Sequence, residues 1–172
     1  MAKHELRFRV APLAAGLILI LWGSVPAQAC NGQMGTIGGT NGDDFIVGTS
    51  GADVINALPG NDTVYALDGA DSVCVGIGYD YVDGGTGDDH IEGSDNDDYL
   101  EGFSENDTIA GHNHSDYVYG ESGNDTLYGG AGNDACVNGG SETDTVDGRT
   151  DSDTCYDPQG GSYFNCETIS FC

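Results

Sequence analysis

GGTGDDHIE, residues 84–92, and GGAGNDACV, residues 129–137, are two copies of a nine-residue pattern that decides the fold of this chain. The pattern begins at residues 39, 48, 57, 66, 75, 84, 93, 102, 111, 120 and 129 and, after one extra residue assigned to Asn138, at 139 and 148. We call each copy a row and its nine positions places one to nine. A short period repeated thirteen times predicts a solenoid, in which each repeat adds one unit to a stack.

Two places keep the same chemical character in every row. Place eight is Ile, Val, Leu or Cys, and in the row at 129 it falls on Cys136. The residues at place six are all Asp: Asp44, Asp53, Asp62, Asp71, Asp80, Asp89, Asp98, Asp107, Asp116, Asp125, Asp134, Asp144 and Asp153. Places one to six are rich in Gly, Asn, Asp and Ser and predict a turn, whereas places seven to nine predict a short strand. Side chains alternate along a strand, so place eight is expected to form a core one side chain thick, and the turns must contribute the remaining stability.

The first 29 residues predict a secretory signal peptide. A basic start is followed by an apolar run that ends at Trp22, and Ala27-Gln28-Ala29 has the small-x-small pattern of a cleavage site. The apolar run is too short for a membrane span. We therefore expect a secreted, extracellular protein, with a surface lipoprotein anchored through Cys30 as the alternative.

The charge of the chain is strongly one-sided. It carries 29 acidic residues against four Lys and Arg, and the predicted signal peptide contains three of those four bases, leaving Arg149. Such a charge opposes compaction and excludes nucleic acid as a natural partner. Because apolar residues recur at every ninth position, we favour a folded chain neutralised by cations over a disordered one.

The ends of the repeat region and the cysteines predict how the stack is closed. Residues 30–38 are expected to form an N-terminal cap, residues 39–156 the repeats, and residues 157–172 a Cys-containing C-terminal cap. An even number of cysteines follows the signal peptide and predicts up to three disulfides. The six cysteines are Cys30, Cys74, Cys136, Cys155, Cys166 and Cys172. We favour Cys155 with Cys166 over Cys155 with Cys136, because in-register pairs on parallel strands are geometrically awkward, and pair Cys30 with Cys74 by elimination.

The row pattern GGxGxDxUx, with U a large apolar residue, resembles the RTX, or haemolysin-type, calcium-binding repeat. The resemblance covers residues 39–156. It implies an all-β, right-handed parallel β-roll in which two rows form one coil, rows two apart stack, and Ca²⁺ ions lie between successive turns.

The residues of the turns agree with calcium as the cofactor. Ca²⁺ takes six to eight oxygen ligands from carboxylates and carbonyls, and glycine permits the tight turns that present carbonyls. Five rows keep glycine at places one and four: Gly39, Gly42, Gly48, Gly51, Gly84, Gly87, Gly120, Gly123, Gly129 and Gly132. Stacked aspartates are expected to bracket the ions, Asp89 with Asp107 and Asp125 on one edge and Asp98 with Asp116 and Asp134 on the other. We expect on the order of ten ions, and distorted or metal-poor turns at Glu105 and Glu142.

The predicted function is that of a secreted calcium-binding β-roll protein whose folding is coupled to Ca²⁺ binding. The alternative is an extracellular polysaccharide- or surface-binding, adhesin-like module. It would use an outward face of tyrosines and acids, with Tyr81, Tyr99 and Tyr117 stacked at place seven of every second row. No nucleophile motif is present and the repeats leave no room for a catalytic domain, so we expect no enzymatic activity. His90, His112 and His114 are expected to be loop residues.

Overall fold

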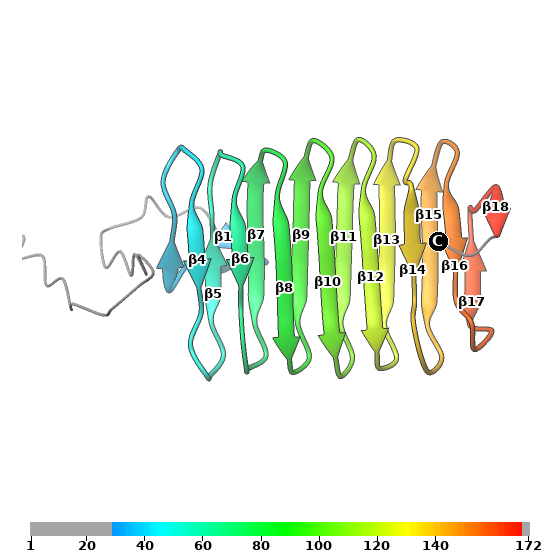
Figure 1. The fold of residues 1–172 in the computed structure, drawn as a ribbon, viewed down its shortest axis with the longest axis horizontal. Coiled ribbons are helices and arrows are strands. Elements are labelled where there is room, and N and C mark those ends of the chain that lie inside the picture. Colours follow the sequence, from blue (N-terminus) through cyan, green and yellow to red (C-terminus); the bar gives the residue numbers. More distant parts are fainter. Residues whose placement is uncertain (1–28, 170–172) are drawn as a thin grey trace, which may run out of the picture.

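The computed structural model describes residues 29–169, which form two parallel β-sheets joined by turns into a flattened coil (Figure 1). The predicted signal peptide, apart from Ala29, and Cys172 lie outside the described residues. Strands of two or three residues are β1 (Ala29–Cys30), β2 (Gln33–Met34), β3 (Ile37–Gly38), β4 (Phe45–Val47), β5 (Val54–Asn56), β6 (Thr63–Tyr65), β14 (Cys136–Asn138), β16 (Thr154–Tyr156), β17 (Ser162–Phe164) and β18 (Thr168–Ile169). Strands of six residues are β7 (Ser72–Ile77), β8 (Tyr81–Thr86), β9 (His90–Asp95), β10 (Tyr99–Ser104), β11 (Thr108–Asn113), β12 (Tyr117–Ser122), β13 (Thr126–Ala131) and β15 (Thr145–Thr150).

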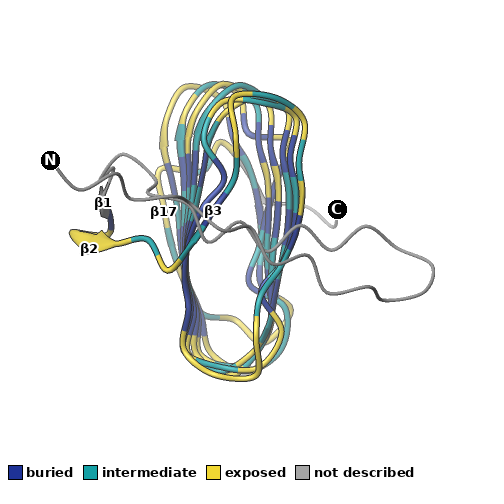
Figure 2. Ribbon diagram, turned by 90° about the vertical axis from the view of Figure 1, so that its left-hand side faces the viewer, coloured by how far each residue is buried: buried dark blue, intermediate teal, exposed yellow. Residues whose placement is uncertain are grey.

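The two sheets alternate along the chain. One contains the even-numbered strands β4 to β18 and the other the odd-numbered strands β3 to β17, and we call them the even sheet and the odd sheet. Each strand of these two sheets pairs in parallel with the strand two rows away, as Leu100 does with Val82 and Val118, while β1 and β2 form a separate antiparallel pair. Seen along the stack, the two sheets face each other and the turns lie at both ends (Figure 2). The predicted all-β parallel roll with stacked alternate rows is confirmed. No helix that could cross a membrane occurs in residues 29–169.

The apolar residues of place eight form the core between the two sheets, as predicted. Ile55, Ile91, Leu100, Ile109 and Leu127 are fully buried within it. The row at 129 differs from the prediction, because Val137 and not Cys136 pairs with Val118 and Cys155 and enters the core. The extra residue is therefore Ala135, which precedes strand β14, and not Asn138 as predicted. Both placements put an apolar residue, Cys136 or Val137, at place eight, so the sequence pattern does not distinguish them.

The turns are shorter than the predicted six residues. In the six-residue strands the ladder continues through places one to three, so only places four to six turn, as in Tyr81–Thr86. Continued alternation directs place one inward. Most rows have glycine there, but Ala57, Ala66 and Val75 fill this column and are fully buried in the core. The core therefore has a second inward column that the sequence pattern did not reveal, because glycine contributes nothing to hydrophobic periodicity.

Both ends continue the stack instead of merely covering it. Residues Ile37–Gly38, in the predicted N-terminal cap, pair with β5, while β17 and β18 of the tail pair with β15 and β16. The disulfide between Cys30 and Cys74 joins β1 to β7, with 5.5 Å between the Cα atoms. Cys155 is bonded to Cys166, with 5.9 Å between the Cα atoms. These two predicted pairings are therefore present, and the alternative of Cys155 with Cys136 is wrong.

Candidate metal centre

The aspartates of place six form two buried ladders, one at each edge of the roll. The backbone N–H of each of the eleven aspartates from Asp44 to Asp134 donates to Oδ1 of the aspartate two rows further on, at distances of 2.7–3.1 Å. Asp89 thus contacts Asp107, and Asp107 contacts Asp125. Asp98 contacts Asp116, and Asp116 contacts Asp134. The structure therefore brings together both predicted sets of stacked carboxylates.

The second carboxylate oxygen of these aspartates is buried and has no hydrogen-bond partner. This is true of Oδ2 in Asp62, Asp71, Asp80, Asp89, Asp98, Asp107, Asp116, Asp125, Asp134, Asp144 and Asp153. Buried polar atoms are normally satisfied, and an unpaired buried carboxylate is especially costly. A regular line of eleven such oxygens indicates a ligand that the polypeptide itself does not supply.

The aspartates lie in an environment that disfavours their charge. Burial and, to a smaller extent, neighbouring carboxylates raise the pKa of Asp98 and of Asp107 from 3.8 to about 8, although the backbone N–H bond lowers it. Burial likewise raises the pKa of Asp62 and Asp89 to about 7 and that of Asp125 to about 6. Keeping all these groups ionised at neutral pH therefore requires positive charge close to the ladders.

Glycine at place one allows the unpaired oxygens to lie close to the backbone. A methyl group built on Gly84 would lie 2.8 Å from Oδ2 of Asp89 and 2.9 Å from the carbonyl oxygen of Gly102. The same arrangement recurs at Gly93, where Oδ2 of Asp98 is at 2.6 Å. At these two glycines a carboxylate oxygen and a carbonyl oxygen from the next coil thus approach too closely for a side chain. Place one is glycine because of this close approach, since its φ does not require glycine.

Left-handed backbone occurs at places two and four. Among the predicted glycines of place four, Gly87, Gly123 and Gly132 have positive φ, whereas Gly42 and Gly51 in the first two rows do not. From the row at 57 onwards these two places stay left-handed whatever the residue: Leu58, Gly60, Leu67, Gly69, Gly76, Gly78, Gly85, Gly87, Ser94, Asn96, Phe103, Glu105, His112, His114, Glu121, Gly123, Gly130, Gly132, Gly140, Glu142, Arg149 and Asp151. The stack therefore imposes the turn conformation on residues that do not favour it.

The predicted distortion at Glu105 and Glu142 is wrong. Both residues adopt the left-handed conformation, with φ of 75° and 73°. Their carboxylates accept hydrogen bonds from the backbone N–H of Gly87 and Gly123, two rows earlier, at 2.9 and 3.1 Å. These contacts across coils offset the conformational strain of a non-glycine residue. His90 and His112 also lie on strands, β9 and β11, and not in loops.

The first two rows satisfy their aspartates without an external ligand. Oδ2 of Asp44 accepts bonds from the N–H and hydroxyl of Thr40, at 2.6 and 2.9 Å. Oδ2 of Asp53 accepts the same pair of bonds from Thr49, at 2.7 and 2.9 Å. Sequence reasoning treated all thirteen aspartates alike. The signal that distinguishes these two rows is threonine at place two.

The tail supplies a further residue that sequence reasoning missed. Oε2 of Glu167 accepts the backbone N–H of Asp153 at 2.8 Å, which is the contact that the next aspartate would make. Glu167 thus continues one ladder by a carboxylate outside the repeat pattern. Only its acidic character, six residues from the chain end, could have suggested this role.

The donor set of the ladders fits a hard divalent cation. The donors are carboxylate and carbonyl oxygens, which Ca²⁺ prefers, and neither His nor Cys belongs to the ladders. Among the residues described, no three His, Cys, Asp or Glu side chains converge closely enough to form a metal site by themselves. Backbone carbonyls must therefore supply most of the six to eight oxygens that Ca²⁺ requires, with stacked aspartates contributing the charge.

Comparison with known proteins identifies the repeats. A family model described as the RTX calcium-binding nonapeptide repeat (4 copies) matches residues 38–73, 75–109 and 101–136, more than half of the chain. No curated protein and no solved structure matches the chain.

Proposed function

The chain belongs to the RTX calcium-binding nonapeptide repeat family, and from that premise we propose that it is a secreted protein whose folding is coupled to Ca²⁺ binding in the turns. The observation that carries the proposal is the line of unpaired, buried Oδ2 atoms along the two ladders. Bound Ca²⁺ supplies the positive charge and coordination that these oxygens lack. The aspartates hold the ion, and their Oδ1 bonds keep successive coils in register.

The proposal gives an expected number of ions. Eleven aspartates have an unpaired Oδ2, and the first two rows are closed by threonine, so we expect about ten Ca²⁺ ions per chain at saturation. Equilibrium dialysis of the disulfide-bonded protein against Ca²⁺, followed by metal analysis, measures this number directly. One or two ions per chain would contradict the proposal, because the ladders would then remain largely unneutralised.

Two Asp→Asn variants on the same ladder test the assignment of the sites. In Asp107→Asn, the amide oxygen must keep accepting the N–H of Asp89, so the amide NH₂ points into the cation site. In Asp53→Asn, the amide oxygen can instead face Thr49, and its NH₂ points away. We expect Asp107→Asn to lose at least one ion and to weaken calcium-dependent folding by about 2–3 kcal/mol, while Asp53→Asn keeps the wild-type ion count. Calorimetric Ca²⁺ titration measures both, and equal effects of the two variants would refute the distinction between the rows.

We propose that the protein acts outside the cell, after removal of residues 1–29. Support comes from the sequence pattern of the first 29 residues and from the disulfides, which form in oxidising compartments. The sulfur of Cys30 is bonded to Cys74, which favours secretion over a lipid anchor at that sulfur. We propose no catalytic role, since the repeats occupy most of the chain.

A polysaccharide- or surface-binding role is the second candidate, and the aromatic face of the even sheet supports it. Tyr81 and Tyr99 are nearly parallel with ring centroids 5.6 Å apart, and Tyr99 and Tyr117 are 5.9 Å apart. The ladder extends beyond the three predicted tyrosines, through Tyr65 to Phe45. The hydroxyl of Tyr81 donates to Oε2 of Glu101 at 2.8 Å, which places a carboxylate among the rings.

This aromatic face borders an open hollow of about 490 Å³ beside the aspartate ladder, lined in part by Tyr79, Tyr81, Tyr99 and Tyr117. Aromatic rings and acidic acceptors together can contact both the apolar faces and the hydroxyls of a sugar. We expect Tyr99→Ala to reduce binding to any recognised glycan at least tenfold on a glycan array. Thr108→Ala, on the odd sheet, should leave it unchanged. Absence of binding to every glycan would refute this second role without affecting calcium binding.

A further inference from the structure

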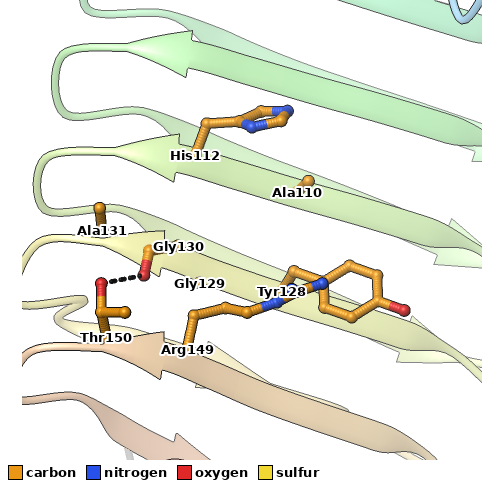
Figure 3. A pocket seen from close by; sticks show the side chains of 8 residues that line it. All are labelled: Ala110, His112, Tyr128, Gly129, Gly130, Ala131, Arg149 and Thr150. Carbon is orange, nitrogen blue, oxygen red and sulfur yellow. Dashed lines mark hydrogen bonds between the residues drawn. The ribbon is translucent and has the colours of Figure 1, made fainter.

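A hollow of about 350 Å³ opens on the outward face of the odd sheet, and none of the ladder aspartates lines it (Figure 3). Its origin is a gap in the column of place-two residues. His112, Gly130 and Arg149 are neighbours in register on β11, β13 and β15. Because Gly130 has no side chain, the side chains on either side of it flank an open floor of Gly129, Gly130 and Ala131.

Arg149 is held over one wall of this hollow. Its guanidinium carbon lies 4.2 Å from the centroid of the Tyr128 ring, a cation–π arrangement. Nε lies 3.4 Å from Oδ2 of Asp147, whose Oδ1 accepts the backbone N–H of Arg149 at 3.0 Å. The aromatic ring and the carboxylate thus fix the orientation of the guanidinium from two directions. The arginine side chain remains half exposed, so it is positioned without being enclosed.

Arg149 is unusual in this chain because it is a basic residue among many acidic ones. Arg149 is the only Lys or Arg between residues 29 and 169, in a protein with 29 acidic residues. A single base among so many acids contributes little to solubility or net charge. The imidazole of His112 lies across the gap and adds a second nitrogen-bearing side chain to the same hollow (Figure 3).

The lining indicates the chemistry of a ligand. Arg presents N–H donors in a planar fork that matches a carboxylate, and Nε already contacts Asp147, so the terminal nitrogens are left to bind. The floor and walls are mostly carbon, from the methyl groups of Ala110 and Ala131 and the ring of Tyr128. Such a surface suits a flat apolar body. The volume is at the lower end of the range for small-molecule sites.

The floor of the hollow is also held in place. The hydroxyl of Thr150 donates to the carbonyl of Gly130 at 3.1 Å, which ties β15 to β13 beside the hollow. Ala131 pairs in register with both Asn113 and Thr150. A ligand would therefore meet a surface already shaped by the strand ladder, and binding would require little reordering.

We propose that this hollow binds a small aromatic carboxylate, with its carboxylate on Arg149 and its ring on the glycine floor beside Tyr128. The site is distinct from the calcium ladders and requires only that the coils are stacked. Its shallow, open form and single arginine imply weak binding, with a dissociation constant in the millimolar range.

The test uses 4-fluorobenzoate as probe, observed by ¹⁹F NMR with the calcium-saturated, disulfide-bonded protein. We expect saturable line broadening with 4-fluorobenzoate and none with neutral 4-fluorobenzamide. Arg149→Gln should reduce the affinity at least tenfold, because it removes the charge and the planar fork. Arg149→Lys should restore only part of it. Ala110→Leu, which fills the hollow and leaves Arg149 in place, should also abolish binding.

The far-UV circular dichroism of each variant, recorded with Ca²⁺, verifies that the roll is folded. Thr154→Ala on the opposite sheet serves as the matched control and should bind the probe as the wild type does. Equal binding of the acid and the amide would overturn the proposal, as would retention of affinity in both Arg149→Gln and Ala110→Leu. Absence of saturable binding by the folded wild type would overturn it as well, and would leave the calcium proposal unaffected.

Discussion

Calcium added to the chelated, disulfide-bonded protein should convert a largely unfolded chain into a β-roll in one cooperative transition. We expect the far-UV circular dichroism to gain β signal at about 0.1–1 mM Ca²⁺, the range typical of extracellular calcium modules. Folding in this range would leave the chain unfolded at cytosolic calcium concentrations and folded outside the cell.

The reason lies in the balance between a thin core and two charged ladders. The core is mainly a single column of Ile, Val and Leu, while the buried aspartates repel one another along both edges. Removing Ca²⁺ leaves eleven buried oxygens unsatisfied, a cost that this core cannot offset. Because each ion contacts successive coils, binding and stacking are expected to proceed together.

Magnesium provides the matched control for this titration. Mg²⁺ requires a smaller, near-octahedral shell and retains its waters, so it should not replace Ca²⁺ at equal concentration. A full β signal in excess chelator at pH 7.5 would contradict the prediction. It would mean that the disulfides and the core suffice, and that the aspartates act only as turn residues.

Without calcium, acid should stabilise the roll. In the folded chain burial raises the pKa of the ladder aspartates from 3.8 to values such as about 6 for Asp80, about 7 for Asp134 and about 8 for Asp98. A carboxylate with a raised pKa holds its proton more tightly in the folded state. Its stabilising contribution is complete below about pH 4 and is lost as the pH rises through 6 to 8.

The expected size of this effect is large because the ladders repeat it. Each aspartate with a pKa of 6 or more disfavours the calcium-free fold at pH 8 by about 3 kcal/mol or more relative to pH 4. Far-UV circular dichroism recorded in excess chelator should therefore show the folded fraction increasing as the pH is lowered from 8 to 4.5.

The pH dependence of Ca²⁺ binding provides a second test of the raised aspartate pKa values. Ca²⁺ binds the ionised carboxylates in competition with protons, so the number of ions bound at a fixed Ca²⁺ concentration should fall as the pH falls from 8 to 5. A free energy of unfolding that rises with pH in the calcium-free protein would contradict the prediction. Buried carboxylates without partners make this free energy fall as the pH rises, whereas exposed aspartates do not.

The regular period of the sequence predicted a solenoid, and its resemblance to the RTX repeat implied the parallel roll. The apolar place eight and the Asp at place six recur every nine residues, and the structure stacks both columns. The pairing of Cys155 with Cys166 was also predicted from strand geometry, and that of Cys30 with Cys74 by elimination.

The features that the sequence did not predict depend on contacts between coils. Place one faces inward beside the aspartates, but its glycine has no side chain to reveal this. Glu105 keeps its turn because it reaches the N–H of Gly87 in another coil. The position of Val137 in the core depends on where a one-residue insertion is absorbed, and several placements fit the same sequence.

Thr40 and Thr49 are visible in the sequence as threonines at place two, but the carboxylate that each one bonds is identified only by the structure. The bonds from their hydroxyls make the N-terminal end of the stack different from the rest. The first two rows need no metal to complete their hydrogen bonds, and the bond between Cys30 and Cys74 ties the same end of the stack.

The N-terminal coils can therefore act as a template for the folding of the remaining coils. As calcium becomes available, the N-terminal coils, which need the fewest ions, can order first and present a strand edge. Refolding then becomes the addition of coils to an existing edge, and the slow step of nucleating a parallel sheet between distant segments is avoided.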